Sequence, residues 1–118
     1  YYMTYFKDKF DFEKRLDEST RIIEKYPDRI PIIVERSKKC TEIKNIDKNK
    51  FLVPKDLTCA QFNYIIRKRL NVNQEQALFF FCDNILHSNN TIIDTVYNKS
   101  KNEDGFLYFV YTVENTFG

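Results

Sequence analysis

Cysteine and histidine are the side chains of this sequence with the widest range of chemistry, and Cys59 is the best placed of them. It falls at the start of a predicted helix, where the helix dipole can lower the pKa of a thiol. A cysteine hydrolase also needs a base, and His87 is the single histidine of the chain. His87 falls in the polar segment 84–90, so we expect it to be solvated rather than paired with a thiol. We expect Cys59 and Cys82 to be packed, unreactive thiols, and the protein not to be an enzyme.

Patterns typical of metal and cofactor sites are missing from the sequence. Cys40, Cys59 and Cys82 are odd in number and widely spaced, which fits neither a disulfide framework nor a zinc site. The chain holds two glycines and no glycine-rich nucleotide-binding motif. We therefore expect no metal and no cofactor, and we expect the protein to occupy a reducing compartment.

Two other features suit binding. Residues 50–53 follow a long polar loop, so a strand there would have a free edge, which is a template for the addition of an extended peptide. Lys48 and Lys50 would attract acidic ligands to that edge, or would only protect it from aggregation. The segment 112–118 ends on Gly118, which has no Cβ and an unhindered carboxyl group. A terminal glycine can pass through a narrow channel, which would suit a functional C-terminus. The alternative explanation for its terminal position is that the sequence is truncated there.

Charge is unevenly distributed along the chain. The net charge of +2 is too small to indicate nucleic-acid binding. Residues 1–76 hold 17 Lys and Arg against 12 Asp and Glu, whereas residues 77–118 hold 2 against 5. A basic first half could meet anionic lipid headgroups or acidic peptides, or it could be an ordinary solvated surface. No apolar run approaches the length of a membrane span.

The elements that must position these residues follow from caps and apolar spacing. Asp11 caps a predicted helix that runs to about residue 25, and a short helical piece over 4–9 precedes it. Residues 30–34 are rich in β-branched side chains and predict a strand. Pro31 within it must lie where no backbone N–H is needed.

The rest of the chain shows the order strand, helix, strand, helical turn, strand. Thr58 and Gln61 form a capping box for the helix. The apolar run 77–82 is continuous, which suggests burial on both faces. The order predicts an α+β fold with one four-stranded mixed sheet (ββαββ), for which the ubiquitin β-grasp is one candidate. These elements are predicted over residues 50–53, 58–70, 77–82, 91–97 and 106–113.

Five segments closely resemble the autophagy-related ubiquitin-like modifiers of the GABARAP and light-chain-3 type: 26–35 (YPDRIPIIVE), 47–54 (DKNKFLVP), 61–69 (QFNYIIRKR), 77–81 (ALFFF) and 103–111 (EDGFLYFVY). They occur in the family's order and spacing. The resemblance implies a ubiquitin-like β-grasp with two additional N-terminal helices and no enzymatic activity. We expect a monomer with a single domain over 1–118: a helical extension (1–26), the β-grasp core (27–113) and a flexible conjugation tail (114–118).

The resemblance also implies that Gly118 is joined to phosphatidylethanolamine. In this family an activating enzyme adenylates the terminal glycine and takes it as a thioester, and a conjugating enzyme passes it to the lipid amine. The protein would be cytoplasmic before lipidation and bound to the autophagosome membrane after it. The abundance of Asn, Lys, Ile, Tyr and Phe is typical of AT-rich genomes and leaves the apicoplast membrane as another location. A peptide-binding adaptor of vesicle trafficking that is never conjugated is the alternative.

A docking groove along residues 50–52 is implied as well. In the family it binds aromatic-x-x-aliphatic motifs with acidic flanks, carried by cargo receptors and by the conjugation machinery. The aromatic residue would enter pocket 1, lined by Glu18, Ile22, Pro31, Ile33, Lys50, Leu52 and Phe106. The aliphatic residue would enter pocket 2, lined by Phe51, Val53, Pro54, Leu57, Phe62 and Ile65. The acidic flanks would meet Arg29, Lys48 and Arg69. A second docking surface around residues 79–81 occurs in some relatives, but we expect most of that run to be core.

Overall fold

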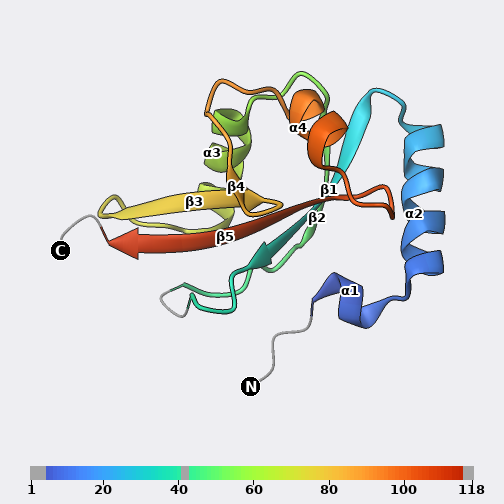
Figure 1. The fold of residues 1–118 in the computed structure, drawn as a ribbon. Helices are drawn as coiled ribbons and strands as arrows, with labels where there is room; N and C mark the ends of the chain where they lie inside the picture. Colours follow the sequence, from blue (N-terminus) through green and yellow to red (C-terminus); the bar gives the residue numbers. More distant parts are fainter. Residues whose placement is uncertain (1–4, 41–42, 116–118) are drawn as a thin grey trace.

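A five-stranded mixed sheet forms the centre of the computed structural model, which describes residues 5–40 and 43–115 (Figure 1). In chain order the elements are α1 (Phe6–Lys9), α2 (Phe12–Lys25), β1 (Arg29–Arg36), β2 (Lys50–Pro54), α3 (Cys59–Leu70), β3 (Gln76–Cys82), β4 (Ile85–Leu86), α4 (Ile93–Ser100) and β5 (Leu107–Asn115). The strand order across the sheet is β2-β1-β5-β3-β4, and only the β1–β5 pairing is parallel. The predicted ββαββ order is present, and β4 is a further strand of two residues.

The two long helices begin where the sequence predicts. The Asp11 side chain accepts a hydrogen bond from the Lys14 backbone N–H at 2.9 Å and caps α2. Thr58 and Gln61 form the complete capping box of α3. At the other end of α3, Asn71 adopts a left-handed conformation with φ of 57°, which ends the helix.

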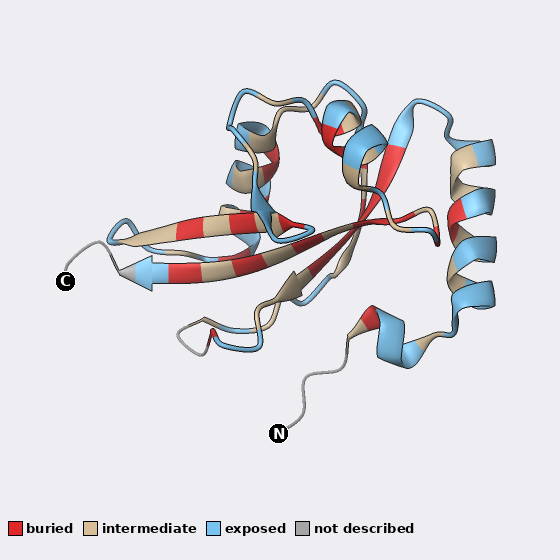
Figure 2. Ribbon diagram, in the orientation of Figure 1, coloured by how far each residue is buried: buried red, intermediate tan, exposed pale blue. Residues whose placement is uncertain are grey.

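Side chains alternate between the two faces of the sheet, and each face builds a separate apolar cluster. Buried and partly buried residues alternate along β3 and along much of β5 (Figure 2). On one face Ile30, Ile32 and Val34 of β1 pack in the main core with residues of α3 and α4. On the other face Ile33 packs with Phe6 of α1 and with partly buried side chains of α2 and β5. The sheet therefore lies between α3 and α4 on one side and α1 and α2 on the other (Figure 1).

Pro31 sits in an interior strand without breaking a hydrogen bond of the sheet. The Val34 N–H donates to the Asn49 carbonyl at 2.8 Å. Because hydrogen-bonded positions alternate along an antiparallel pair, Pro31 falls on a non-hydrogen-bonded position opposite Leu52. Its nitrogen faces β5, whose pairing with β1 starts only at Ile32. Pro31 thus occupies a place where no N–H is needed, as expected.

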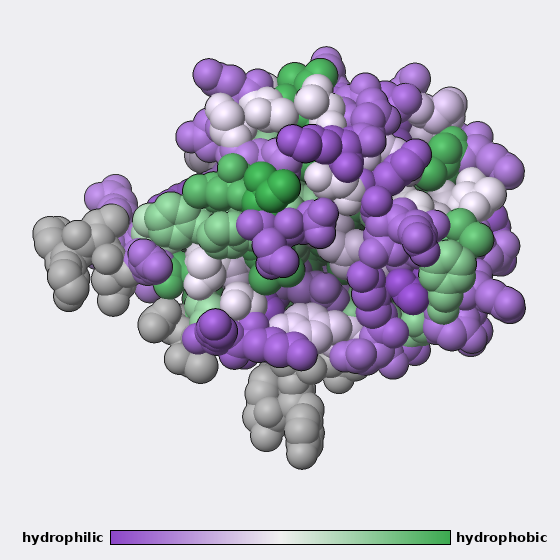
Figure 3. Space-filling model, in the orientation of Figure 1, coloured by the Kyte–Doolittle hydropathy of each residue, from purple (hydrophilic) through white to green (hydrophobic). Residues whose placement is uncertain are grey.

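The expectation that both faces of β3 are buried was wrong. Leu78, Phe80 and Cys82 are buried against α3, whereas Phe79 and Phe81 on the opposite face remain partly exposed. Figure 3 shows apolar side chains gathered over β3 and β4. In the described part of the chain α1 and α2 cover the β1 end of that face and leave the β3 end open (Figure 1).

A buried ion pair fixes α2 against the end of the sheet. Asp104 has no exposed surface. Its carboxylate accepts hydrogen bonds from the Arg15 guanidinium at 2.6 Å, from the Tyr108 hydroxyl at 2.5 Å and from the Phe106 N–H at 2.9 Å. A charge removed from water needs such partners, so the position of α2 is tightly specified.

Gly105 lets the chain come close to α2 at the same point. It has a φ of 90°, and a Cβ there would collide with the Ser19 hydroxyl. The Ser19 hydroxyl donates a hydrogen bond to the Asp104 carbonyl. Only glycine satisfies both the conformation and the close approach.

Candidate functional site

The strand β2 lies at an edge of the sheet and pairs with β1 alone in the described part of the chain. No second described strand therefore pairs with the backbone N–H and C=O groups on its outer side, as the sequence predicts. Such an edge can accept one more strand from another polypeptide.

The register of β2 on β1 divides the predicted groove residues between the two faces of the sheet. Leu52 lies opposite Pro31, and Lys50 lies opposite Ile33, so these four side chains share the face that α2 covers. Phe51 and Val53 of β2 point to the other face, where they join the main core beneath α3. The β2 residues predicted for pocket 1 and for pocket 2 thus lie on opposite sides of the same edge strand.

The residues predicted to line pocket 1 combine buried apolar side chains with a charged pair. Pro31, Ile33 and Phe106 are buried, the last two with no exposed surface. At the rim Lys50 donates a hydrogen bond to the carboxylate of Glu18 on α2, with 43% of the lysine and 35% of the glutamate side chain exposed. This pair spans the gap between α2 and the edge strand. Ile22 and Leu52 are partly buried.

The residues predicted to line pocket 2 are all apolar. Its floor is the edge-to-face pair of Phe51 and Phe62, with ring centroids 5.9 Å apart. Leu57 is partly buried, and Ile65 and Pro54 are exposed. Val53, which is buried, completes the set. Ile65 is 40% exposed on α3, whereas Phe62 on the preceding turn is buried.

The three basic residues predicted to meet acidic flanks lie at the two ends of β2. The Lys48 ammonium and the Arg69 guanidinium both lie over the Phe51 ring, at 5.2 and 5.7 Å from its centroid. Arg69 also pairs with Asp47 at 3.3 Å, and this hydrogen bond lowers the pKa of the aspartate. Arg29 is exposed and lies opposite Pro54 at the other end. The structure brings Lys48 and Arg69 together and holds Arg29 apart from them.

The predicted conjugation residue, Gly118, lies outside the described residues. The strand β5 runs on to Asn115 and pairs with β3 there, beyond the predicted end of the core at Val113. The first residues of the predicted tail therefore belong to the sheet.

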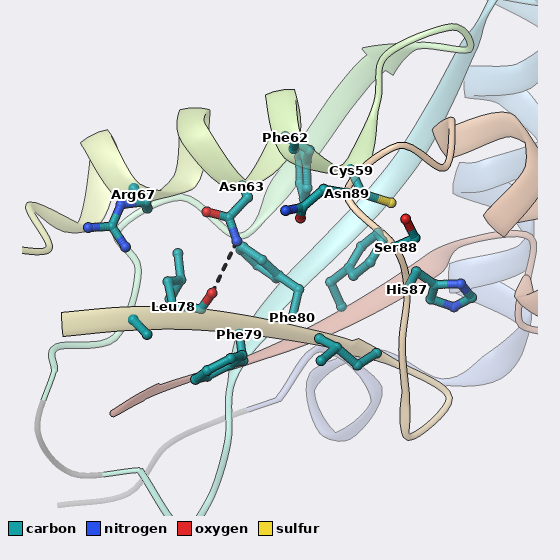
Figure 4. A pocket seen from close by; sticks show the side chains of 14 residues that line it. Cys59, Phe62, Asn63, Arg67, Leu78, Phe79, Phe80, His87, Ser88 and Asn89 are labelled. Carbon is teal, nitrogen blue, oxygen red and sulfur yellow. Dashed lines mark hydrogen bonds between the residues drawn. The ribbon is translucent and has the colours of Figure 1, made fainter. Parts of the chain in front are cut away.

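A cavity of about 530 Å³ between α3 and β3 was not predicted (Figure 4). It shares Phe62 with pocket 2 but opens on another part of the surface. Its polar wall includes Asn63, whose side-chain amide donates to the Leu78 carbonyl at 3.2 Å. Arg67 also lines the cavity, and its guanidinium donates to the carbonyls of residues 73 and 76. No sequence pattern signals such a hollow, because its shape depends on how far α3 stands from the sheet.

Cys59 and His87 both line this cavity, but they do not form a catalytic pair. Both residues lie in the described part of the chain, and no hydrogen bond joins their side chains. Burial raises the pKa of the Cys59 thiol, which opposes reactivity, and burial raises the pKa of Cys82 to about 12. His87 is partly buried rather than solvated as expected. Its Nε2 has no hydrogen-bond partner, and burial lowers its pKa.

Over residues 5–40 and 43–115 no group of three or more His, Cys, Asp or Glu side chains is arranged to hold a metal ion. No helix there combines the length and the apolar character that crossing a membrane requires.

Comparison with known proteins places the chain in a family. The family described as "Autophagy protein Atg8 ubiquitin like" matches residues 14–118. Autophagy-related protein 8e of Arabidopsis thaliana is 56% identical over 113 residues, which are 96% of this chain and 92% of the plant protein. Autophagy-related protein 8 of Schizosaccharomyces pombe is also 56% identical over 113 residues, or 96% of this chain and 93% of the yeast protein. The crystal structure of Trypanosoma brucei ATG8 matches with a TM-score of 0.88 and 38% identity, over 99% of this chain and 100% of that one.

These similarities confirm the predicted ubiquitin-like α+β fold with its additional N-terminal helices. Proteins of this family are ubiquitin-like modifiers and adaptors rather than enzymes, so the family assignment confirms that this protein is not an enzyme. The chain belongs to the Atg8 family of ubiquitin-like autophagy proteins.

Proposed function

We propose that this protein is conjugated through Gly118 to phosphatidylethanolamine and then recruits partners that carry aromatic-x-x-aliphatic motifs. The lipidated form would reside on the autophagosome membrane, as resemblance to the family implies. Its partners would be the activating and conjugating enzymes of the lipidation cascade and cargo receptors or adaptors with such motifs. We further propose that it acts as a monomer.

The observation that supports the peptide-binding part is that the residues predicted for the two pockets lie on opposite faces of one free edge strand. In an extended peptide, successive side chains point to opposite faces, so residues separated by three positions also point to opposite faces. A strand added beside β2 would therefore direct its aromatic residue toward α2 and its aliphatic residue toward α3. The spacing of the motif matches the geometry of the groove.

Apolar burial supplies most of the expected affinity. Each anchor side chain contributes roughly 1.5–3 kcal/mol when it leaves water. Ion pairs between acidic flanks and exposed Lys48 or Arg69 contribute about 0.2–1 kcal/mol each. The pockets would hold the peptide, and the basic residues would set its orientation and its rate of association.

Reconstitution tests the conjugation. The protein is incubated with the activating and conjugating enzymes of a relative, ATP and liposomes containing phosphatidylethanolamine, and lipidation is followed by gel mobility and liposome flotation. We expect conversion that requires ATP and that Gly118→Ala abolishes. The two acyl chains of phosphatidylethanolamine would anchor the lipidated protein firmly in the liposome membrane. An unmodified wild-type protein, or modification of Gly118→Ala, contradicts the proposal.

A second arm separates conjugation from adaptor activity. Leu57→Ala lies in pocket 2 and leaves Gly118 intact. We expect its lipidated form to float with liposomes but to recruit a fluorescent aromatic-x-x-aliphatic peptide poorly.

If Gly118→Ala rescues autophagy in cells as well as the wild type does, the protein acts as an unconjugated adaptor instead.

A further inference from the structure

The base of pocket 1 is covered by a residue that belongs to neither predicted pocket. Ile33 and Phe106 have no exposed surface, and the side chain packed on both of them is Phe6 of α1. The Phe6 ring meets the Phe106 ring edge-on, with centroids 5.2 Å apart. Phe6 is itself only 2% exposed. These three residues form the buried cluster on the α2 face of the sheet.

Phe6 also reaches the charged rim of the same pocket. The Lys50 ammonium lies 5.6 Å from the centroid of the Phe6 ring, and the same ammonium pairs with Glu18 of α2. One aromatic ring therefore contacts the base of pocket 1 through Phe106 and its rim through Lys50. The proposed aromatic anchor, which enters between α2 and β2, would therefore approach this ring.

Specific polar contacts fix the ring in this place. The Phe6 backbone N–H donates to the Glu35 carboxylate at 2.7 Å, and the Tyr5 hydroxyl donates to the Arg36 carbonyl at 2.8 Å. Both partners lie on β1, which also carries Pro31 and Ile33 of pocket 1. The start of α1 is thus anchored to the strand that forms the wall of the pocket, so the Phe6 ring is a fixed part of the site.

We propose that Phe6 closes the inner end of pocket 1 and determines which aromatic side chain the pocket prefers. This inference rests on the proposed peptide-binding function and adds a residue to it. The Phe6 ring limits the depth available to the aromatic anchor. A smaller side chain at this position leaves space at the closed end. Indole, the largest aromatic group, gains more from that space than the phenyl ring does.

Three peptides that differ only in the aromatic residue of an acidic-flanked aromatic-x-x-Leu motif (Trp, Tyr or Phe) test the inference. Their affinities for the wild type, Phe6→Leu and Phe12→Leu are measured by calorimetry. Phe12 on α2 is 41% exposed and is the matched control. We expect Phe6→Leu to raise the ratio of Trp-peptide to Phe-peptide affinity by at least about threefold, and Phe12→Leu to leave the ratio unchanged.

The ratio stays informative if the variant is partly unfolded. An inactive fraction weakens the apparent affinity of all three peptides by the same factor, so the ratio is unaffected. Phe6→Met, whose flexible side chain has about the volume of leucine, serves as the second variant if Phe6→Leu does not fold, and there too we expect the ratio to shift toward the Trp peptide. An unchanged ratio in the folded Phe6 variant, with a wild type that binds, overturns the inference alone. A wild type that binds none of the three peptides overturns the proposed function itself.

Discussion

Lys50 of the edge strand and Glu18 of α2 form an ion pair that joins the two walls of pocket 1. Both side chains are partly exposed, so the pair adds little to stability. Its importance lies in its position, because it places a cation among the residues of the proposed pocket 1 and on the edge strand β2. An acidic-flanked peptide that docks there would meet this cation first.

Reversing the charge of Lys50 is expected to weaken peptide binding. In Lys50→Glu the new carboxylate lies beside Glu18 and faces the acidic flank of the peptide, so two attractions become repulsions. We expect the dissociation constant to rise about tenfold, corresponding to about 1.4 kcal/mol. Lys99→Glu makes the same charge change on α4, away from the groove, and is the control. Equal calorimetric affinities for the two variants would refute the role of Lys50.

Pocket 2 is tested by pairing a protein change with a peptide change. Leu57→Ala removes a wall of the pocket, and replacing the aliphatic residue of the peptide by Ala removes its occupant. We expect each change alone to cost about tenfold in affinity and the second to cost little once the first is made. Tyr64→Ala, at a position 58% exposed on α3, should show no such coupling. If the losses of affinity from Leu57→Ala and from the peptide change were additive, the aliphatic residue would bind away from Leu57.

The buried ion pair of α2 is expected to dominate the effect of charge on stability. Arg15→Met leaves the fully buried Asp104 carboxylate without its cation and should lower the free energy of unfolding by about 3–5 kcal/mol. Arg21→Met breaks the exposed pair with Asp17 and should cost about 0.2–1 kcal/mol. Urea denaturation measures both. Similar losses in the two variants would mean that the Arg15–Asp104 pair does not hold α2.

Glu35 is expected to make stability depend on pH. Burial raises the pKa of its carboxyl above the ordinary 4.5, and the hydrogen bond from the Phe6 N–H opposes this only in part. Because the folded state then binds the proton more tightly than the unfolded chain, the ionised carboxylate costs stability at neutral pH. That cost disappears as the pH falls through the raised pKa.

Glu35→Gln keeps a hydrogen-bond acceptor for Phe6 and removes the charge. Its free energy of unfolding relative to the wild type should therefore be highest near neutral pH and should decrease as the pH approaches about 4. Denaturation at several pH values measures this difference. A difference that stays constant over the range would show that Glu35 titrates alike in the folded and unfolded chains.

Local signals in the sequence predicted most of the elements. The caps at Asp11 and Thr58 depend on residues within one helical turn, so the starts of α2 and α3 could be predicted. The strand β4 could not, because two residues show no periodicity. The turn before it places Asp83 and Asn84 at positive φ, which these residue types tolerate without requiring it.

Features that depend on distant contacts were missed. The partial exposure of Phe79 follows from where α1 and α2 stop covering the sheet, which its own neighbours in sequence do not determine. Ile65 has the spacing of a core residue, yet its direction depends on the tilt of α3. The contact of Phe6 with pocket 1 joins residues far apart in the chain, and only the fold reveals it.

The spacing of the peptide motif gives the most direct test of a groove with pockets on opposite faces of β2. Calorimetry compares an acidic-flanked aromatic-x-x-aliphatic peptide with an aromatic-x-aliphatic peptide of the same composition. The shorter spacing turns the aliphatic side chain to the same face as the aromatic one and away from pocket 2. We predict that the first peptide binds at least about tenfold more tightly, because only it fills both pockets. Equal affinities of the two peptides would contradict this arrangement.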